Sequence, residues 1–226
     1  MKSKINIEEI IQHLKAMHPN PVCELVYNSP FELLVAVILS AQCTDKRVNQ
    51  VTSVLFKQFN TPQQFAQLTT EQLKPYIFTC GFFNNKAKNI IATAKTLVDE
   101  FNGVVPNTVD ELIKLQGVGK KTANVVFAVG FGGDAIAVDT HVLRVSNRLG
   151  LANSKNPLEV EKQLNAVIPK EEWSVFHHLL IHQGRYICKA QKPKCEECNL
   201  NDVCNYFATV NKDNNKGKKD NKNAKN

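Results

Sequence analysis

A glycine-rich turn followed by two lysines lies near the middle of the chain. An apolar run ends at Leu115, Gly117-Val118-Gly119 forms the predicted turn, and a helix is predicted to begin near Lys120. Glycine frees the backbone for sharp or left-handed turns, and successive amides at a helix N-terminus bind anions. The helix dipole disfavours a cation in this first turn, so Lys120 and Lys121 favour a functional explanation. The pattern predicts a phosphate-binding turn that carries a reactive amine.

A carboxylate follows further along the chain. Asp139 lies between the apolar strip Ala135–Val138 and Thr140-His141. Taken alone, an aspartate before a threonine is commonly a helix N-cap. In the same way, a lysine after Gly-x-Gly is commonly a phosphate contact or a solvated residue. Chemistry by Lys121 and Asp139 therefore depends on what else the sequence contains.

Four of the seven cysteines are packed close together. They have the spacing C-x6-C-x2-C-x5-C and are Cys188, Cys195, Cys198 and Cys204. Such a cluster predicts one four-coordinate metal centre, either zinc or iron–sulfur. Structural zinc sites usually pair two C-x2-C knuckles, and only one such pair is present. The six-residue loop wraps a larger object more easily, which favours [4Fe–4S].

The loop between the first two clustered cysteines is basic. It carries Lys189, Lys192 and Lys194 within six residues. Lysines on a clamped loop suit contacts to phosphate. A solvated run of charge is the alternative interpretation.

These motifs, in this order, resemble the endonuclease III family. The turn followed by Val-Asp-Thr-His and the four-cysteine spacing carry the resemblance, together with Leu39-Ser40-Ala41-Gln42. The resemblance extends from about Pro21 to Tyr206. Members of this family are helix-hairpin-helix DNA glycosylases with abasic-site lyase activity. The resemblance implies an all-α, two-lobed fold, a DNA cleft between the lobes, and a C-terminal [4Fe–4S] loop.

The family's motifs also imply individual roles. Lys121 matches the catalytic lysine, and Asp139 matches the catalytic aspartate. Gln42 matches a residue that fills the gap left by an extruded nucleotide, and Phe82 occupies a second wedge position where many relatives carry leucine. The remaining predicted DNA contacts are Gly117, Gly119, Lys120, His141 and the three lysines of the basic loop.

The resemblance implies a base-excision-repair enzyme acting on double-stranded DNA with damaged bases or abasic sites. It would remove oxidised pyrimidines and cleave the abasic site 3′ by β-elimination through a lysine Schiff base. A mismatch-type adenine glycosylase shares the cluster spacing, but that branch usually lacks this lysine. A non-catalytic DNA-binding protein with a structural metal is a third possibility. No motif reads a particular lesion, and the residues leave open whether Asp139 acts electrostatically or moves a proton.

Helices are predicted to position these motifs. Apolar residues recur at helical spacing, and convincing alternation of the kind typical of strands is absent, so the sequence predicts an all-α fold. Capping residues occur three positions before Glu or Gln at six sites. The predicted N-caps are Asn6, Ser29, Thr61, Thr69, Thr108 and Asn156.

Two lobes and a tail are expected. A helical lobe would cover 23–133 and contain the helix-hairpin-helix at about 108–128. Residues 1–22 and 134–210 would form the iron–sulfur lobe. The Lys/Asn-rich stretch 211–226 cannot bury a core and is predicted to be disordered.

Charge and hydropathy limit the class of partner. Of the net charge of +7, residues 211–226 contribute +4 through six lysines and two aspartates. Basic character is consistent with a polyanion partner without establishing one. The longest apolar run, 33–41, is too short to span a bilayer, and the charged N-terminus is not that of a signal peptide. We expect a cytoplasmic monomer without a membrane partner, associated with the nucleoid if the source is bacterial.

Overall fold

The structure is a computed structural model that describes residues 6–210. These residues form helices and loops with no β-strand among them, which confirms the all-α prediction. The predicted tail at 211–226 lies outside the described residues. Within 6–210, no helix combines the length and the apolar composition that crossing a membrane requires.

The chain divides into two compact units. Cys23–Ala137 forms one, here called the hairpin unit, and the chain up to Val22 joins the chain from Val138 onward to form the other, here called the cysteine unit. The sequence placed the second boundary at 133/134. In the structure Asn124, which is buried, donates from Nδ2 to the carbonyl oxygen of Ile136 at 3.1 Å. This contact and the burial of Ile136 hold the strip after 133 within the hairpin unit.

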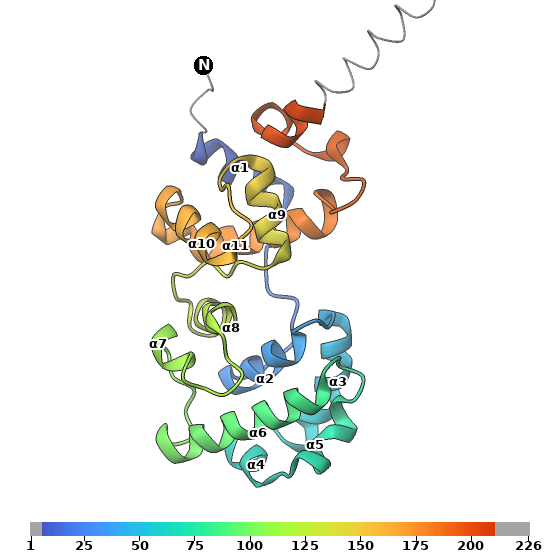
Figure 1. Cartoon of the computed structure of the whole chain (residues 1–226), viewed down its shortest axis with the longest axis vertical. Helices are drawn as coiled ribbons and strands as arrows, with labels where there is room; N and C mark the ends of the chain where they lie inside the picture. Colours follow the sequence, from blue (N-terminus) through green and yellow to red (C-terminus); the bar gives the residue numbers. More distant parts are fainter. Residues whose placement is uncertain (1–5, 211–226) are drawn as a thin grey trace, which may run out of the picture. The chain divides into compact units, whose positions relative to one another are not determined.

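A buried helix organises the hairpin unit. Every residue of α2 (Pro30–Ser40) from Phe31 to Leu39 is buried. The long helix α6 (Phe83–Glu100) lies along α4 (Pro62–Gln67) and α5 (Thr70–Ile77), and α3 (Asp45–Gln58) packs on α2 (Figure 1). Next come α7 (Val109–Leu112), α8 (Lys120–Val125) and a π-helical turn, η1 (Val126–Gly130). The apolar character of α2 is therefore explained by its central place in the unit.

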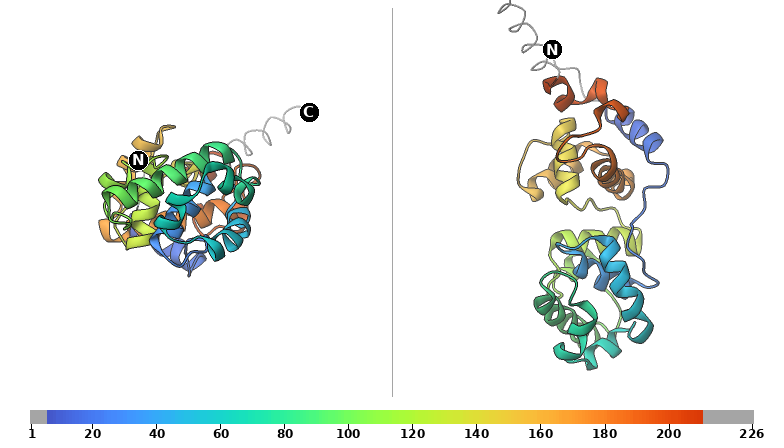
Figure 2. Two further views of the ribbon diagram at one scale, coloured as in Figure 1. Left: turned by 90° about the horizontal axis from the view of Figure 1, so that it is seen from below. Right: turned by 90° about the vertical axis from the view of Figure 1, so that its right-hand side faces the viewer.

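The cysteine unit is built on α9 (Thr140–Leu149) and α11 (Trp173–His182). These two pack together, with α1 (Ile7–Met17) on α11 and α10 (Pro157–Val167) on α9 (Figure 2). Leu14, Val145, Phe176 and Leu180 are among the buried residues at these contacts. The remaining elements are short turns: η2 (Lys170–Glu172), η3 (Gln183–Ile187), η4 (Cys195–Glu197) and η5 (Asn201–Val203).

The six predicted helix starts are confirmed. Each predicted N-cap side chain accepts a hydrogen bond from a backbone amide in the first turn of its helix. Thr61 with Gln64, and Thr69 with Gln72, form complete capping boxes. Because such caps satisfy amides that have no partner inside the helix, local sequence alone determines where these helices begin.

Candidate functional site

The turn between α7 and α8 is docked on the hairpin unit by its apolar residues. Leu115 and Val118 are buried, and the Thr93 hydroxyl donates to the carbonyl oxygen of Gln116 at 2.8 Å. Gly119, by contrast, is exposed. The turn is therefore held by its buried apolar residues and by the hydrogen bond from Thr93, while the residues that begin α8 face solvent.

The two glycines of this turn serve different ends. Gly117 has φ +77°, and a Cβ there would lie 2.4 Å from Nδ2 of Asn89. Gly119 has extended backbone with φ −85° and ψ 173°, and a Cβ there would meet nothing within 4 Å. Gly117 is thus required for the turn itself, whereas Gly119 leaves the amide end of α8 uncovered.

Lys120 and Lys121 are the first two residues of α8. Both are exposed, and the N-cap Gly119 has no side chain to shield them. Neither lysine forms an ion pair with another residue in the range 6–210. The amine predicted to be catalytic is therefore presented to solvent from a fixed helix end.

Asp139 is the N-cap of α9 in the cysteine unit. Its Oδ1 atom accepts the backbone amides of His141 and Val142, each at 2.8 Å. The interpretation of Asp139 as an N-cap, which the sequence allowed, is confirmed. A cap through Oδ1 leaves the second carboxylate oxygen for another task.

His141 lies half-buried beside the cap. Nη2 of Arg144 contacts its Nδ1 at 3.1 Å and donates to the carbonyl oxygen of Gly184 at 2.9 Å. Burial lowers the pKa of His141 and the charges of Arg144 and Arg185 lower it further, while Asp139 acts in the opposite direction. His141 is therefore a half-buried ring packed inside its own unit, and a DNA contact by it stays a prediction.

Gln42 and Phe82 occupy neighbouring loops of the hairpin unit. A Cβ on Gly81 would lie 3.6 Å from the carbonyl oxygen of Gln42. Gln42 has φ +53° and Phe82 has φ +58°, a left-handed conformation that residues with a side chain rarely adopt. The Phe82 side chain is 65% exposed, and Gln42 is exposed as well. Two loops that lie next to each other thus each carry one exposed side chain on strained backbone.

The four clustered cysteines line one cavity in the cysteine unit. Apolar residues of α9 and η3 complete its wall, namely Val145, Leu149 and Ile187. Burial raises the pKa of Cys195, Cys198 and Cys204, and neighbouring thiols of the cluster raise it further. Within residues 6–210 no three His, Cys, Asp or Glu side chains come close enough to hold a single metal ion.

Two side chains around this cavity donate to sulfur. Nη1 of Arg148 donates to Sγ of Cys188 at 3.3 Å, and Nε2 of Gln183 donates to Sγ of Cys198 at 3.3 Å. Donors of this kind stabilise metal-bound thiolates and fix their orientation. Four thiols, an apolar wall and two sulfur-directed donors fit an iron–sulfur cluster.

The basic loop between Cys188 and Cys195 is braced from α9. Arg148 donates to the carbonyl oxygens of Lys189 at 2.7 Å and Ala190 at 3.0 Å. Lys189 and Lys192 are exposed, whereas Lys194 pairs with Glu197 at 2.9 Å. Two of the three predicted phosphate-contacting lysines therefore lie open to solvent, and the third is partly neutralised.

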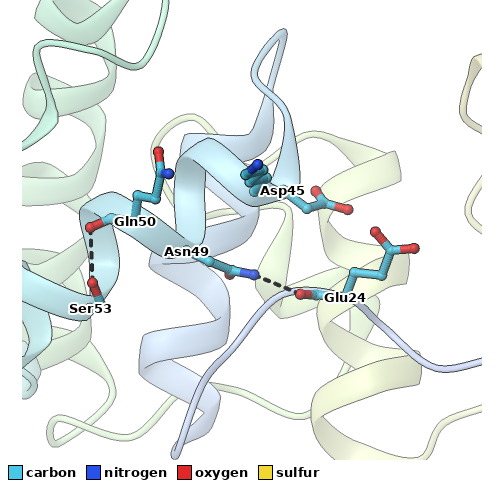
Figure 3. Close-up of a pocket in the computed structure, with 6 residues that line it drawn as sticks. Glu24, Asp45, Asn49, Gln50 and Ser53 are labelled. Carbon is cyan, nitrogen blue, oxygen red and sulfur yellow. Dashed lines mark hydrogen bonds between the residues drawn. The ribbon is translucent and has the colours of Figure 1, made fainter.

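A separate polar pocket lies on the hairpin unit. Its lining comes from α3 and the segment before α2: Glu24, Asp45, Lys46, Asn49, Gln50 and Ser53. In Figure 3, Nδ2 of Asn49 donates to the carbonyl oxygen of Glu24, at 2.8 Å. The pocket contains none of the residues predicted from the sequence to be functional.

The predicted site residues are shared between the two units. Lys121, Gln42 and Phe82 belong to the hairpin unit, and Asp139, the basic loop and the four cysteines belong to the cysteine unit. Sequence reasoning missed two side chains that support these residues, Lys86 and Gln183, and it interpreted Arg148 only as a phosphate ligand or an ion-pair partner. A signal existed for Lys86, which interrupts the apolar stripe of α6 that continues through Ala87, Ile90 and Ile91.

Two family models match the sequence of this chain. Residues 35–170 match the model of the HhH-GPD superfamily base excision DNA repair proteins. Residues 188–204, from the first clustered cysteine to the last, match the iron–sulfur binding domain of endonuclease III. The fold and site therefore define a base-excision-repair protein with a [4Fe–4S] cofactor.

The individual proteins that this chain resembles are endonucleases III. Endonuclease III of Bacillus subtilis is 52% identical over 199 residues, covering 88% of this chain and 91% of the relative. Endonuclease III of Escherichia coli K12 is 48% identical over 202 residues, covering 89% and 96%. A solved structure of a trapped endonuclease III–DNA covalent intermediate has a TM-score of 0.86 at 49% identity, covering 92% of this chain and 99% of that one.

The chain belongs to the endonuclease III family. It is accordingly an enzyme of base excision repair, a DNA glycosylase that also cleaves abasic sites. Both functional alternatives that the sequence left open, the mismatch-type adenine glycosylase and the non-catalytic DNA-binding protein, are thereby set aside.

Proposed function

We propose that Lys121 is the nucleophile of this glycosylase and lyase, and that Asp139 acts on the same sugar. The observation that carries the proposal is the exposed amine at the first turn of α8, directly after the docked Gly117–Gly119 turn. It is supported by the covalent enzyme–DNA intermediate trapped for a structural relative. An amine fixed on a helix end needs little reordering to reach an extruded nucleotide.

The chemistry begins with the neutral amine of Lys121. A bond forms between Nζ and C1′ of the deoxyribose as the bond from C1′ to the damaged base breaks, and the base leaves with the bonding pair and a proton. Opening of the sugar ring breaks the bond from C1′ to O4′, and O4′ takes a proton from water. The resulting protonated imine makes the C2′ proton acidic. Loss of that proton expels the 3′ phosphate, and water then releases Lys121. Asp139 supplies the carboxylate that balances positive charge on the sugar.

Other residues hold the DNA in the reactive form. Gln42 and Phe82 enter the space that the extruded nucleotide leaves, as intercalating side chains do. The open amide end at Gly119, together with Lys120, binds backbone phosphate. His141 and the exposed lysines of the basic loop contact phosphates on the side of the cysteine unit.

The four clustered cysteines are the proposed ligands of the [4Fe–4S] cluster. When bound, the cluster supplies iron–thiolate bonds that clamp residues 188–204. Arg148 and Gln183 orient two of the thiolates, and Arg148 also holds the basic loop. The cofactor thus serves to present the loop to DNA.

The proposed substrates are oxidised pyrimidines and abasic sites in double-stranded DNA, and the proposed working form is a monomer. The relatives named above are bacterial proteins, and we place the enzyme in the cytoplasm at the nucleoid. A panel of duplexes with a single thymine glycol, 8-oxoguanine or mismatched adenine tests the substrate. Preference for either purine lesion would contradict the proposal.

Borohydride trapping tests the nucleophile. Incubation with abasic DNA and borohydride should give a covalent adduct with the natural protein and with Lys95→Gln, a control at an exposed lysine of α6 in the same unit. Lys121→Gln should give none. An undiminished adduct with Lys121→Gln would remove the assignment.

A further inference from the structure

A lysine that the proposed chemistry does not use is buried in the hairpin unit. Lys86 lies in the first turn of α6 and is only 5% exposed. Its Nζ donates to the carbonyl oxygen of Leu39 at 2.8 Å and to that of Ala41 at 2.7 Å. These carbonyls lie at the C-terminal end of α2, where helix carbonyls have no partner inside the helix and a cation is favoured.

The helix backbone fixes Lys86 relative to the second loop. The amide of Lys86 donates to the carbonyl oxygen of Phe82 at 3.1 Å. Lys86 therefore binds the carbonyl immediately before Gln42 with its side chain and the carbonyl of Phe82 with its main chain. Lys86 thus connects the two neighbouring loops that carry Gln42 and Phe82.

Both linked residues have strained backbone. Gln42 at φ +53° and Phe82 at φ +58° adopt a conformation that persists only where the surroundings impose it. Residues 41 and 42 form a turn after α2, and Phe82 is the N-cap of α6 without a side-chain cap bond. The contacts of Lys86 supply constraints that these short loops do not provide by themselves.

The charge of Lys86 has no acidic partner in the range 6–210. Burial lowers its pKa, and the thiols of Cys80 and Cys43 act in the opposite direction. An ammonium group has three donors and no acceptor, so two backbone carbonyls are well suited to it. Burying an ammonium for packing alone is unfavourable compared with an apolar side chain of similar length. The position therefore indicates a task that needs the donors.

We propose that Lys86 is the positioning residue that sets Gln42 and Phe82 as a pair for insertion into DNA. The inference rests on the role proposed above for those two side chains. Without the Nζ contacts the Gln42 loop loses its hydrogen bonds to α6. Gln42 and Phe82 then no longer enter the duplex together, and the damaged nucleotide is held outside it less often.

Lys86→Met tests this, with Lys95→Met as the matched control because Lys95 is exposed on the same helix. Single-turnover base release from a damaged duplex should fall roughly 10- to 100-fold in Lys86→Met, as expected for misplaced positioning groups. Cleavage of a single-stranded abasic oligonucleotide, which has no opposite strand to separate from, should change by less than about twofold. Lys95→Met should match the natural protein on both substrates. An equal loss on both substrates would show general damage to the fold and overturn the proposal.

A double-mutant cycle tests whether the loss of activity in Lys86→Met arises through Gln42 and Phe82. The variant Gln42→Ala/Phe82→Ala should itself lose duplex activity, and adding Lys86→Met to it should change the rate by less than about twofold, because coupled residues are not additive. A full additional loss, or wild-type duplex activity of the double variant, overturns the proposal. If Lys86→Met does not fold, Lys86→Gln, which keeps two N–H donors, takes its place in the same cycle with a smaller expected loss. Failure of the proposed nucleophile would appear separately, as absence of a trapped adduct with the natural protein.

Discussion

The Oδ1 atom of Asp139 accepts a hydrogen bond from the backbone amide of Val142 at 2.8 Å, which makes Asp139 the N-cap of α9. The amide of His141 reaches the same oxygen. The two bonds fix the side chain on a helix start, where a negative charge is favourable. The structural cap and the proposed catalytic charge belong to one residue, since capping occupies only one of the two oxygens.

Substitutions of Asp139 should separate these two tasks. Asparagine caps helices about as well as aspartate, so Asp139→Asn should change the free energy of unfolding by less than about 0.5 kcal/mol, whereas Asp139→Ala should lower it by about 1 kcal/mol. Both should lose base release by roughly 100-fold, because both lose the negative charge. Urea unfolding and single-turnover kinetics measure the two effects.

Asn156→Ala is the matched control for the cap. Asn156 caps α10 in the same unit, with its Oδ1 accepting the amide of Leu158 at 2.9 Å. This variant should lose a similar free energy of unfolding and keep its activity. Full activity in Asp139→Asn would reduce Asp139 to a helix cap.

The strained backbone at Phe82 predicts opposite effects on stability and activity. Glycine adopts φ +58° without steric cost, and the Phe82 ring is too exposed to contribute much packing. Phe82→Gly should therefore raise the free energy of unfolding by about 0.5 to 1 kcal/mol. Base release from duplex DNA should fall, because the side chain that enters the duplex is gone.

Asn102→Gly is the control for Phe82→Gly. Asn102 has φ +51° in the loop after α6, at the opposite end of this helix from Phe82. It should gain stability without losing activity. If Phe82→Gly also kept full duplex activity, the wedge assignment would be wrong.

The sequence predicted what local chemistry determines. Helix starts such as those at Thr61 and Thr69 depend on a few neighbouring residues, and all six were predicted correctly. The cysteine spacing predicted the metal centre in the same way, although the choice of [4Fe–4S] over zinc needed the family resemblance. Each of these features lies within a short stretch of chain.

The rest depends on contacts between distant segments. The carbonyls that Lys86 binds lie more than forty residues away in the chain, so no local pattern indicates them. The different backbones of Gly117 and Gly119 were likewise not predictable, because two glycines in one turn look alike in the sequence. The unit boundary after Ala137 is set by the contact of Asn124 with Ile136, which the apolar strip did not reveal.

Stability should depend on pH through His178. Burial lowers the pKa of this ring from 6.5 to about 4, and the charges of His182 and Arg185 contribute. Because the unfolded chain takes up the proton first, the free energy of unfolding should fall as the pH drops from 6.5 towards 4, by at most about 3 kcal/mol. Above pH 6.5 this contribution is fully present.

His178→Phe removes this titration and keeps a ring of similar size. Urea unfolding at several pH values between 7.5 and 4.5 should show a smaller loss in the variant than in the natural protein. Some loss should remain, because burial also lowers the pKa of His18 and His141. An identical pH dependence in both proteins would exclude His178 as the source.

Arg148 should control how firmly the iron–sulfur cluster and the basic loop are held. Its guanidinium donates to Cys188 Sγ and to the carbonyl oxygens of Lys189 and Ala190, and lies 4.3 Å from the ring centroid of Tyr206. Lysine cannot reproduce this planar set of donors. In Arg148→Lys the absorbance of the cluster should therefore decay roughly 10-fold faster in the presence of a chelator, as for other residues that orient metal ligands.

Comparison with a second variant separates this bracing from simple loss of charge. Arg148→Lys keeps the positive charge, while Lys162→Met removes one from an exposed position on α10 in the same unit. If bracing matters, Arg148→Lys should lose both cluster and affinity for DNA, and Lys162→Met should keep its cluster. Equal rates of cluster decay in the natural protein and in Arg148→Lys would show that the cysteines hold the cluster without Arg148. The basic loop would then owe its shape to the iron–thiolate bonds alone.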